Sequence, residues 1–279
     1  MKTFHNKVAA ITGAGSGIGQ QLAILLAQQG CHLALSDISP QGLEATCRLI
    51  QADVKISQTV VDVSQKTQVE AWARQVLQAH GRVNLIFNNA GVALGSTIEG
   101  ASYEELEWIM NINFWGVVYG TKSFLPLLKQ SGDGHVINLS SVFGLTAQPT
   151  QAGYNASKFA VRGFTEALRQ ELDLQNCGVS ALCVHPGGIK TNIANAARIN
   201  HSLATLGMNV DDSTRSFNDF LRYPPEKAAQ DILDAVLKNK RRVLIGNDAK
   251  ALDIVQRLLP SAYQRLMQIG SQLRERLKS

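Results

Sequence analysis

Tyr154 and Lys158 stand four residues apart in a stretch, residues 152–176, whose pattern predicts a helix. At that spacing the two side chains share one face of the helix, one turn apart. A lysine ammonium beside a phenol favours the phenolate and lowers the pKa of the tyrosine from about 10. Tyr154 is therefore a candidate general base toward an alcohol and, in reverse, a general acid toward a ketone. Taken alone, the pair also fits a solvated helix face.

A serine precedes this pair. Ser141 lies 13 residues before Tyr154, just after a buried apolar run at residues 135–139. At the carboxyl end of a strand, a hydroxyl can donate a hydrogen bond to a substrate oxygen as negative charge develops there. Ser140 is the adjacent competitor for this role.

A glycine-rich turn lies near the start of the chain. Residues 12–19 read Thr-Gly-Ala-Gly-Ser-Gly-Ile-Gly, between a predicted strand and a predicted helix. Glycines let the backbone pass close to a pyrophosphate, which the N–H groups and dipole of the helix N-terminus then hold. A simple turn would explain the glycines alone, but their position between strand and helix favours a dinucleotide site.

Two acidic residues follow the next strands. Asp37 ends the second strand, 18 residues after Gly19, where a carboxylate accepts hydrogen bonds from adenosine ribose hydroxyls and repels a 2′-phosphate. Neither neighbour of Asp37 is an arginine, so the sequence favours NAD over NADP as cofactor. Asp62 and Val63 follow the third strand and are candidates for the adenine edge. For both acids the structural alternative is a helix N-cap, near Ser64 in the case of Asp62.

These motifs lie at the ends of elements that alternate along the chain. Short apolar runs predict strands at residues 8–12, 32–36, 56–61, 84–88, 135–139, 179–184 and 242–245. Helical periodicity predicts helices at residues 17–29, 40–51, 65–79, 102–112, 115–130, 152–176 and 225–238. Such alternation gives right-handed crossovers and a parallel sheet covered on both faces. The sequence predicts an α/β fold: a single doubly wound Rossmann domain over residues 1–279, with a mostly parallel seven-stranded sheet and helices on both faces.

Two further segments do not belong to this alternation. Residues 188–223 are irregular and too long for an ordinary loop, so we expect them to form a lid over the site. Residues 247–279 carry apolar residues at helical spacing, interrupted by Pro260, and predict a C-terminal helical extension.

The ordered set of motifs resembles the short-chain dehydrogenase/reductase family over residues 5–246. The resemblance rests on Thr12 to Gly19, Asp37, Asn88-Asn89-Ala90-Gly91, Asn113, Ser141, Tyr154, Lys158 and Pro186-Gly187. The G-x-x-x-G-x-G form of the turn is similar to that of the compact members of the family.

The resemblance implies roles for individual residues. The implied catalytic set is Asn113, Ser141, Tyr154 and Lys158, with Asn113 holding a water that links the lysine to a proton relay; a helix-ending amide is the alternative for Asn113. The implied cofactor-binding set is Gly13, Ser16, Gly17, Ile18, Gly19, Asp37, Asp62, Val63, Asn89, Ala90, Gly91, Tyr154, Lys158, Pro186, Gly187, Ile189 and Thr191. The family also commonly pairs subunits through helices that correspond to residues 103–130 and 152–176, so we expect a homo-oligomer, a dimer or a tetramer.

The expected function is an oxidoreductase that transfers a hydride between NAD and a secondary alcohol or its ketone. An NADP-dependent ketoreductase and a non-catalytic dinucleotide-binding regulator are the alternatives. A hydrophobic substrate of lipid-, steroid- or aromatic-like character is suggested by Val92, Leu94, Val142, Phe143, Leu145 and Gln148, and in the lid by Ile193, Ile199, Leu203, Leu206, Met208, Phe217, Phe220 and Tyr223. A carboxylate or a coenzyme A tail is the competing choice, suggested by Lys190, Arg198, Arg215 and Arg222.

Composition sets the remaining expectations. No apolar run is long enough to cross a bilayer, and no signal-peptide core follows Met1, so we expect a cytoplasmic protein. The four cysteines show no CxxC pair and no histidine at zinc spacing, which favours reduced thiols and no metal site. The net charge of +5 divides into −2 over residues 1–237 and +7 over residues 238–279. This asymmetry argues against a nucleic-acid surface; the basic tail either packs on the body or makes weak peripheral contact with an anionic membrane.

Overall fold

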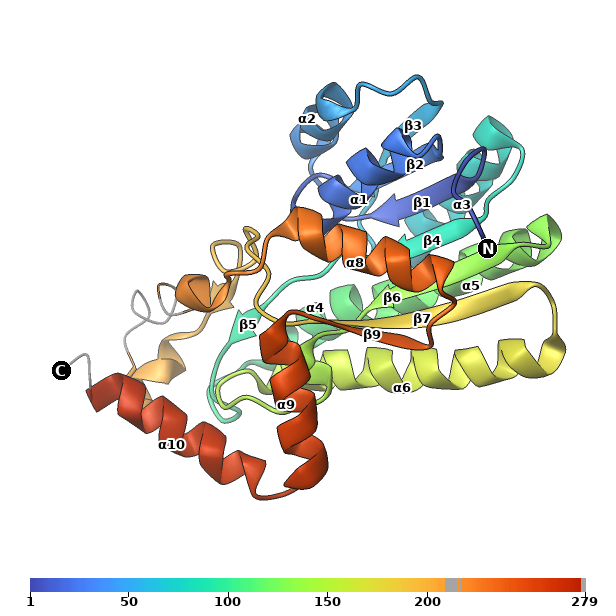
Figure 1. Cartoon of the computed structure of the whole chain (residues 1–279). Coiled ribbons are helices and arrows are strands. Elements are labelled where there is room, and N and C mark those ends of the chain that lie inside the picture. The colour runs from blue at the N-terminus through green and yellow to red at the C-terminus, as the bar shows by residue number, and fades with distance from the viewer. Residues whose placement is uncertain (209–214, 216, 277–279) are drawn as a thin grey trace.

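A seven-stranded parallel sheet forms the centre of the structure, a computed structural model that describes residues 1–208, 215 and 217–276 (Figure 1). The strand order is β3-β2-β1-β4-β6-β7-β9, and each neighbouring pair is parallel. The strands are β1 (Val8–Thr12), β2 (His32–Asp37), β3 (Ile56–Val60), β4 (Leu85–Asn88), β6 (Gly134–Leu139), β7 (Val179–Pro186) and β9 (Arg242–Ile245). The predicted α/β fold is confirmed. The order of strands reverses between β1 and β4, and open α/β sheets bind ligands at such a point.

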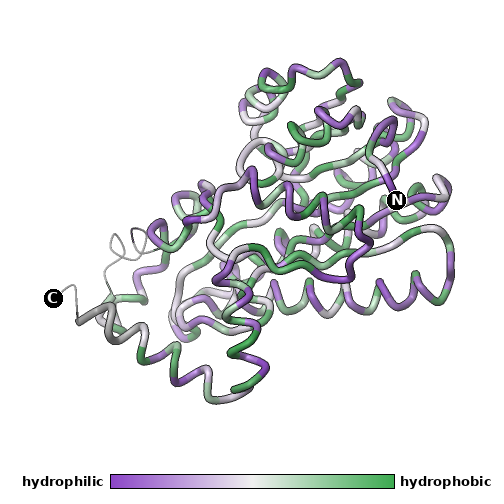
Figure 2. Tube along the Cα trace, viewed as in Figure 1, coloured by the Kyte–Doolittle hydropathy of each residue, from purple (hydrophilic) through white to green (hydrophobic). Residues whose placement is uncertain are grey.

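Helices cover both faces of the sheet because its strands are apolar on both sides. In β1, Ala9 and Ile11 pack in one core with α1 (Gly17–Gln28), α2 (Pro40–Leu49) and α8 (Pro225–Leu237). Val8 and Ala10 pack in the opposite core with α3 (Lys66–His80), α5 (Gly116–Ser131) and α6 (Ala152–Gln175). This alternation follows from the period of two in a strand. In Figure 2 the central strands are correspondingly hydrophobic, while the outer helices alternate between the two colours.

A π-helical turn joins two segments that the sequence predicts as separate helices. α4 (Tyr103–Met110) begins with a capping box between Ser102 and Glu105 and runs through a π-helical stretch, Asn111–Trp115, directly into α5. The prediction of a break at this point is wrong, because the extra residue of a π turn is absorbed without ending the helix. The turn rotates Asn113 inward, where its side chain is fully buried.

The predicted lid contains more regular structure than its sequence indicates. β8 (Arg198–Ile199) pairs in parallel with β5 (Leu94–Gly95), and a 3-10 turn, η3, covers His201–Leu206. Two-residue strands leave no periodic signal, so the sequence could not show them. Residues 209–214 and 216, which belong to the predicted lid, lie outside the described residues.

The C-terminal extension consists of α9 (Asn247–Leu258) and α10 (Tyr263–Arg276), as the apolar spacing predicts. In Figure 1 the two helices leave the end of β9 and run outside the helical layers of the sheet. Ala249 is fully buried and Tyr263 is 6% exposed, so the inner side of each helix packs on the body. Within the described part of the chain, no helix combines the length and the apolar character needed to cross a membrane.

Candidate active site

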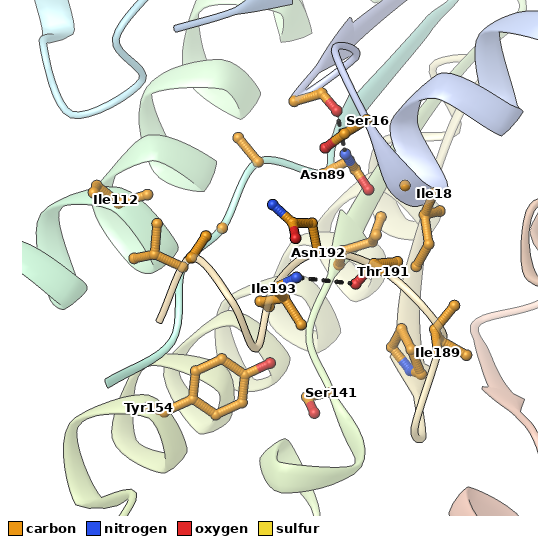
Figure 3. Close-up of a pocket in the computed structure, with 18 of the residues that line it drawn as sticks. Ser16, Ile18, Asn89, Ile112, Ser141, Tyr154, Ile189, Thr191, Asn192 and Ile193 are labelled. Atoms are coloured by element: carbon orange, nitrogen blue, oxygen red, sulfur yellow. Dashed lines mark hydrogen bonds between the residues drawn. The ribbon is translucent and has the colours of Figure 1, made fainter. Parts of the chain in front are cut away.

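A cavity of about 490 Å³ opens at the carboxyl ends of the central strands. Figure 3 shows Tyr154 on one side of it, with Thr191 and Ile193 across the space and Ser16, Ile18 and Asn89 farther along. Its wall contains every predicted catalytic and cofactor-binding residue except Gly19 and Asn113. These residues come from seven separate segments of the chain and are brought together at the point where the strand order reverses.

The glycine turn forms one end of the cavity. Gly13 and Gly17 have positive φ values of 65° and 54°, which favour glycine. A Cβ on Gly13 would lie 2.9 Å from the Ala90 Cα, and one on Gly17 would lie 2.9 Å from Thr191 Cγ2. Gly19 has a packing role instead, because its Cβ would lie 2.1 Å from the carbonyl oxygen of Gly13. The N-terminus of α1 therefore opens into the cavity across a backbone without side chains, which fits a bound pyrophosphate.

Asp37 braces the glycine turn from the rim of the cavity. Its Oδ2 accepts a hydrogen bond from the Gly15 N–H at 2.8 Å, and its Oδ1 accepts one from the Ser39 N–H at 2.9 Å. The N-cap alternative for Asp37 is wrong, because Ser39 caps α2 by accepting from the Gly42 N–H at 3.1 Å. Among the residues that the structure describes, Lys158 is the only cationic side chain in the cavity wall.

Asp62 and Val63 line the same end of the cavity. Asp62 Oδ1 accepts hydrogen bonds from the Ser64 N–H at 2.9 Å and the Ser64 hydroxyl at 2.7 Å. The N-cap alternative for Asp62 is wrong, because α3 begins after Gln65 and the Asp62 carboxylate bonds Ser64 in the turn before it. The role of Asp62 at the adenine edge stays a prediction.

Two asparagines hold the segment after β4, one within it and one on the π-helical stretch. Asn89 Nδ2 donates to the carbonyl oxygens of Thr12 at 2.9 Å and Gly13 at 3.1 Å, which fixes this segment against the glycine turn. Asn113 Oδ1 accepts from the Val92 N–H at 2.8 Å, and Asn113 Nδ2 donates to the Val92 carbonyl at 3.0 Å. The side chain of Asn113 thus positions the backbone at the cavity wall, and its alternative as a helix-ending amide is wrong because the helix continues through it.

Tyr154, Ser141 and Lys158 line the cavity together. Burial raises the pKa of the Tyr154 phenol, and a hydrogen bond with Ser141 opposes this shift. Lys158 Nζ lies 5.6 Å from the centroid of the Tyr154 ring and donates to the Leu139 carbonyl at 3.0 Å. Burial lowers the pKa of Lys158 to about 8. The expectation that Lys158 lowers the Tyr154 pKa is wrong for this structure, since desolvation of the phenol dominates.

Ser140 and His185 hold the backbone around these three residues. Ser140 also lines the cavity, but its hydroxyl donates to the Lys158 carbonyl at 2.8 Å, so Ser141 is the serine whose hydroxyl proton is left for a substrate. His185 Nδ1 lies 2.9 Å from the Ser141 carbonyl oxygen, and burial lowers the pKa of His185 to about 4. Because a carbonyl only accepts, the neutral ring must carry its proton on Nδ1. The imidazole therefore fixes the backbone of Ser141.

The remaining cavity wall is mostly apolar, with Asn192 and Ser140 as its polar members. Its apolar members include Val92, Trp108, Ile112, Val142, Phe143, Ile193, Ala196, Phe217, Phe220 and Leu221. Several predicted pocket residues lie elsewhere: Leu94, Leu145, Gln148, Ile199, Leu203, Leu206, Met208 and Tyr223. Contacts of the small β5–β8 sheet explain part of this error, because Ile199 and Leu203 face Gly95. The sequence reasoning missed Trp108 and Ile112, although their spacing of four residues in one continuous helix was a usable signal.

Comparison with known proteins decides the family. The family model described as short chain dehydrogenase matches residues 7–202. The chain belongs to the short-chain dehydrogenase family. "Putative oxidoreductase SadH" from Mycobacterium tuberculosis is 45% identical to it over 276 residues, which cover 97% of each chain.

Solved structures agree with this assignment. A short-chain dehydrogenase/reductase from Burkholderia phymatum, crystallised in complex with NAD, superimposes with a TM-score of 0.85 and 30% identity, covering 92% of this chain and 95% of the other. An alcohol dehydrogenase from Thermococcus sibiricus, complexed with 5-hydroxy-NADP, gives a TM-score of 0.70 and 27% identity over 86% and 95% of the two chains. This short-chain dehydrogenase is thus an NAD(P)-dependent oxidoreductase, and its structural neighbours include binders of either dinucleotide form.

Proposed function

We propose that this enzyme transfers a hydride between NAD(H) and a hydrophobic secondary alcohol or its ketone. One observation carries the proposal: the hydroxyl-bearing residues Ser141 and Tyr154 stand where a cavity suited to a dinucleotide meets an apolar wall. A pocket with few convergent polar groups in an apolar lining is typical of a small-molecule site. The bound nicotinamide would supply the hydride acceptor or donor.

The chain's own residues would handle the proton and the developing charge. Ser141 donates a hydrogen bond to the substrate oxygen, and Tyr154 exchanges a proton with that oxygen. Because burial raises the pKa of Tyr154, its phenol stays protonated at neutral pH in this structure and is ready to donate to a ketone. Lys158, with a pKa lowered to about 8, remains mostly an ammonium at pH 7 and supplies a positive charge beside them.

NAD is the cofactor that the rim of the cavity favours. Asp37 presents a carboxylate where the adenosine ribose would lie, and its orientation is fixed by the amides of Gly15 and Ser39. A 2′-phosphate would meet this negative charge without a cation in the described wall to balance it. The charge at the rim therefore does not support the NADP-dependent alternative.

The substrate class follows from the charges that the wall does not contain. The four basic residues that suggested a carboxylate or coenzyme A substrate lie outside the described cavity wall: Lys190, Arg198, Arg215 and Arg222. The Arg198 guanidinium stacks on the ring of Trp108, 3.8 Å from the ring centroid. Trp108 lines the cavity and Arg198 does not. These positions favour a lipid-, steroid- or aromatic-like alcohol over a charged one.

Two measurements test the proposed function. Fluorescence titration with NADH and NADPH should show preferential binding of NADH. A panel of secondary alcohols, matched in size but differing in charge, should then give NAD-dependent turnover only for the apolar members. Turnover restricted to short charged substrates would contradict the apolar assignment. Tight NADH binding without turnover of any alcohol or ketone would favour the non-catalytic regulator.

A homodimer is supported by an exposed aromatic surface. Trp115 is 43% exposed at the end of the π-helical stretch that leads into α5, and Phe159 is 40% exposed on α6; both lie in the helical segments through which the family pairs. Apolar rings exposed to this extent on adjacent helices are typical of an interface.

The four cysteines are free, which accords with a reducing cytoplasmic location.

Weak contact with an anionic membrane is supported by the outer side of the C-terminal extension. Ile254 and Leu258 on α9 and Leu266 and Ile269 on α10 are all more than half exposed, within a segment of charge +7. Apolar and basic residues together are what an amphipathic surface helix uses to bind anionic lipid. Co-sedimentation with phosphatidylserine vesicles should fall when Leu258 and Leu266 are both changed to glutamate, and equal recovery of both proteins in the supernatant would contradict this role.

A further inference from the structure

We infer that the C-terminal extension is a working part of the active site, in which Asp248 and Tyr263 position two loops that border the cavity. The inference rests on the proposed function for its catalytic consequence. The short-chain dehydrogenase model ends at residue 202, so the extension lies outside the segment that defines the family. The alignment with the Mycobacterium tuberculosis relative covers 97% of the chain and therefore reaches into residues 247–279.

The first contact holds the loop that follows β7. The Gly188 N–H donates to Asp248 Oδ2 at 2.7 Å, at the start of α9. This loop continues into Ile189 and Thr191, which line the cavity and belong to the implied cofactor-binding set. On its other side the loop is held by the Gly188 carbonyl, which accepts from the N–H groups of Arg222 and Tyr223, both at 2.9 Å. Asp248 therefore completes a clamp that closes on Gly188 from both directions.

The fit of the carboxylate depends on two glycines. A Cβ on Gly187 would lie 2.2 Å from Asp248 Oδ2, and a Cβ on Gly246 would lie 2.3 Å from Asp248 Oδ1. A larger residue at either position would therefore displace the carboxylate. A hydrogen bond between an ionised carboxylate and a backbone amide is about twice as strong as a neutral one, which suits it to holding a loop.

The second contact holds the loop that follows Ser141. The Tyr263 hydroxyl, buried at the start of α10, accepts a hydrogen bond from the Ala147 N–H at 3.2 Å. Asn155 Nδ2 donates to the Gln148 carbonyl at 2.8 Å, so the same loop is tied to α6 next to Tyr154. The loop thus connects the two hydroxyl-bearing residues of the site, and Tyr263 fixes it from outside.

The body of the extension packs against the same residues. Ala249 on α9 is fully buried in a cluster with Val142, Phe143 and Tyr154. Asp253 on the same helix forms ion pairs with Arg242 at 2.8 Å and Arg257 at 3.0 Å, neither of which belongs to the two loops. Asp253 therefore offers a matched control that perturbs α9 without releasing Gly188 or Ala147.

Hydrogen exchange measured by mass spectrometry on the unliganded full chain tests the contacts directly. Asp248→Ala should speed exchange in peptides that cover residues 187–190 and leave residues 143–150 unchanged, whereas Tyr263→Phe should do the reverse. Asp253→Ala should lower the melting temperature without speeding exchange specifically in either loop. The inference would be overturned if each loop exchanged at the same rate in the wild type and in all three variants. It would also be overturned if Asp253→Ala changed exchange in the same peptides as Asp248→Ala.

Binding and kinetics test the consequence. Asp248→Ala should weaken NADH binding about tenfold, the effect of losing one charge-assisted hydrogen bond, and Asp248→Asn, which keeps an acceptor oxygen, should recover most of it. Tyr263→Phe should lower kcat/KM for the alcohol about fivefold with unchanged NADH affinity. A wild-type chain that binds neither dinucleotide would refute the proposed function, while the exchange data would still decide whether the extension positions the loops. Unchanged NADH affinity in Asp248→Ala would refute the positioning role in cofactor binding.

Discussion

Changing Asp37 to asparagine removes one negative charge from the rim of the cavity while keeping the shape of the side chain. The carboxylate accepts from the amides of Gly15 and Ser39 at 2.8 and 2.9 Å, so it is held in one orientation. A 2′-phosphate carries a charge of about −1.5 to −2 at pH 7. Two unit charges about 5 Å apart at this half-exposed rim repel by about 1–2 kcal/mol, for an effective dielectric constant of about 40–80.

The repulsion of the phosphate should therefore cost about 1.5–3.5 kcal/mol, which is about a 10- to 300-fold preference for NADH over NADPH. Asp37→Asn should remove most of this preference, chiefly through tighter NADPH binding. NADH binding should weaken by less than tenfold, because the amide oxygen replaces only one of the two acceptors and binds a ribose hydroxyl less strongly.

Titration of nucleotide fluorescence at low and high salt measures both affinities. Asp62→Asn is the matched control, since this second carboxylate lines the same end of the cavity but accepts its hydrogen bonds from Ser64. It should leave the ratio of affinities within about twofold of that of the wild type. The reasoning is refuted if the wild type binds NADPH as tightly as NADH. It is also refuted if Asp37→Asn weakens both nucleotides equally, because Asp37 would then act only by bracing the glycine turn.

Three further predictions concern the catalytic centre, the buried histidine and the aromatic surface. Tyr154→Phe should lower kcat about 10²- to 10⁴-fold with unchanged NADH affinity, measured by steady-state kinetics and titration; retention of most activity would contradict the proton-transfer role. The pKa of His185 is lowered to about 4 in the fold, so the unfolded chain takes up the proton first as pH falls below about 6.5. This linkage should cost about 2 kcal/mol of unfolding free energy between pH 7.5 and pH 5, and His185→Asn should abolish that part of the loss in urea unfolding curves at the two pH values. Changing Trp115 and Phe159 together to serine should shift the chain from dimer to monomer by light scattering; a wild-type monomer at micromolar concentration would contradict the dimer.

The sheet and the ends of its strands could be predicted because their signals are local. Apolar runs alternating with helical periodicity gave the order of elements, and glycine, acidic and asparagine residues after the strands marked one edge of the sheet. Topology alone then brings those ends together, which is why Asp37, Asn89 and Ser141 meet in one cavity. The predictions that failed are those that depend on how closely side chains are packed. The rise in the Tyr154 pKa comes from burial, which the spacing of Tyr154 and Lys158 does not reveal.

The substrate side of the cavity could not be assigned for a related reason. An apolar residue in a lid packs either inward or against its own segment, and hydrophobicity is the same in both cases. Ile193 lines the cavity while Leu203 packs toward Gly95, because the β5–β8 pairing fixes the direction of that part of the lid. A strand of two residues carries no period from which this direction could be read.

The C-terminal extension shows what kind of trace a long-range contact leaves in a sequence. Its helices follow from apolar spacing, but Asp248 meets Gly188 across 60 residues, and Tyr263 meets Ala147 across 116. Each contact joins a side-chain oxygen to a backbone N–H, and every residue except proline offers the same N–H, so the residue type at the donating position gives no signal of the contact. The sequence signal of the Asp248 contact lies one residue before the donor Gly188. Gly187 is a glycine because the carboxylate of Asp248 occupies the space that a Cβ would need, and a glycine that a turn does not explain therefore indicates the close approach of another group.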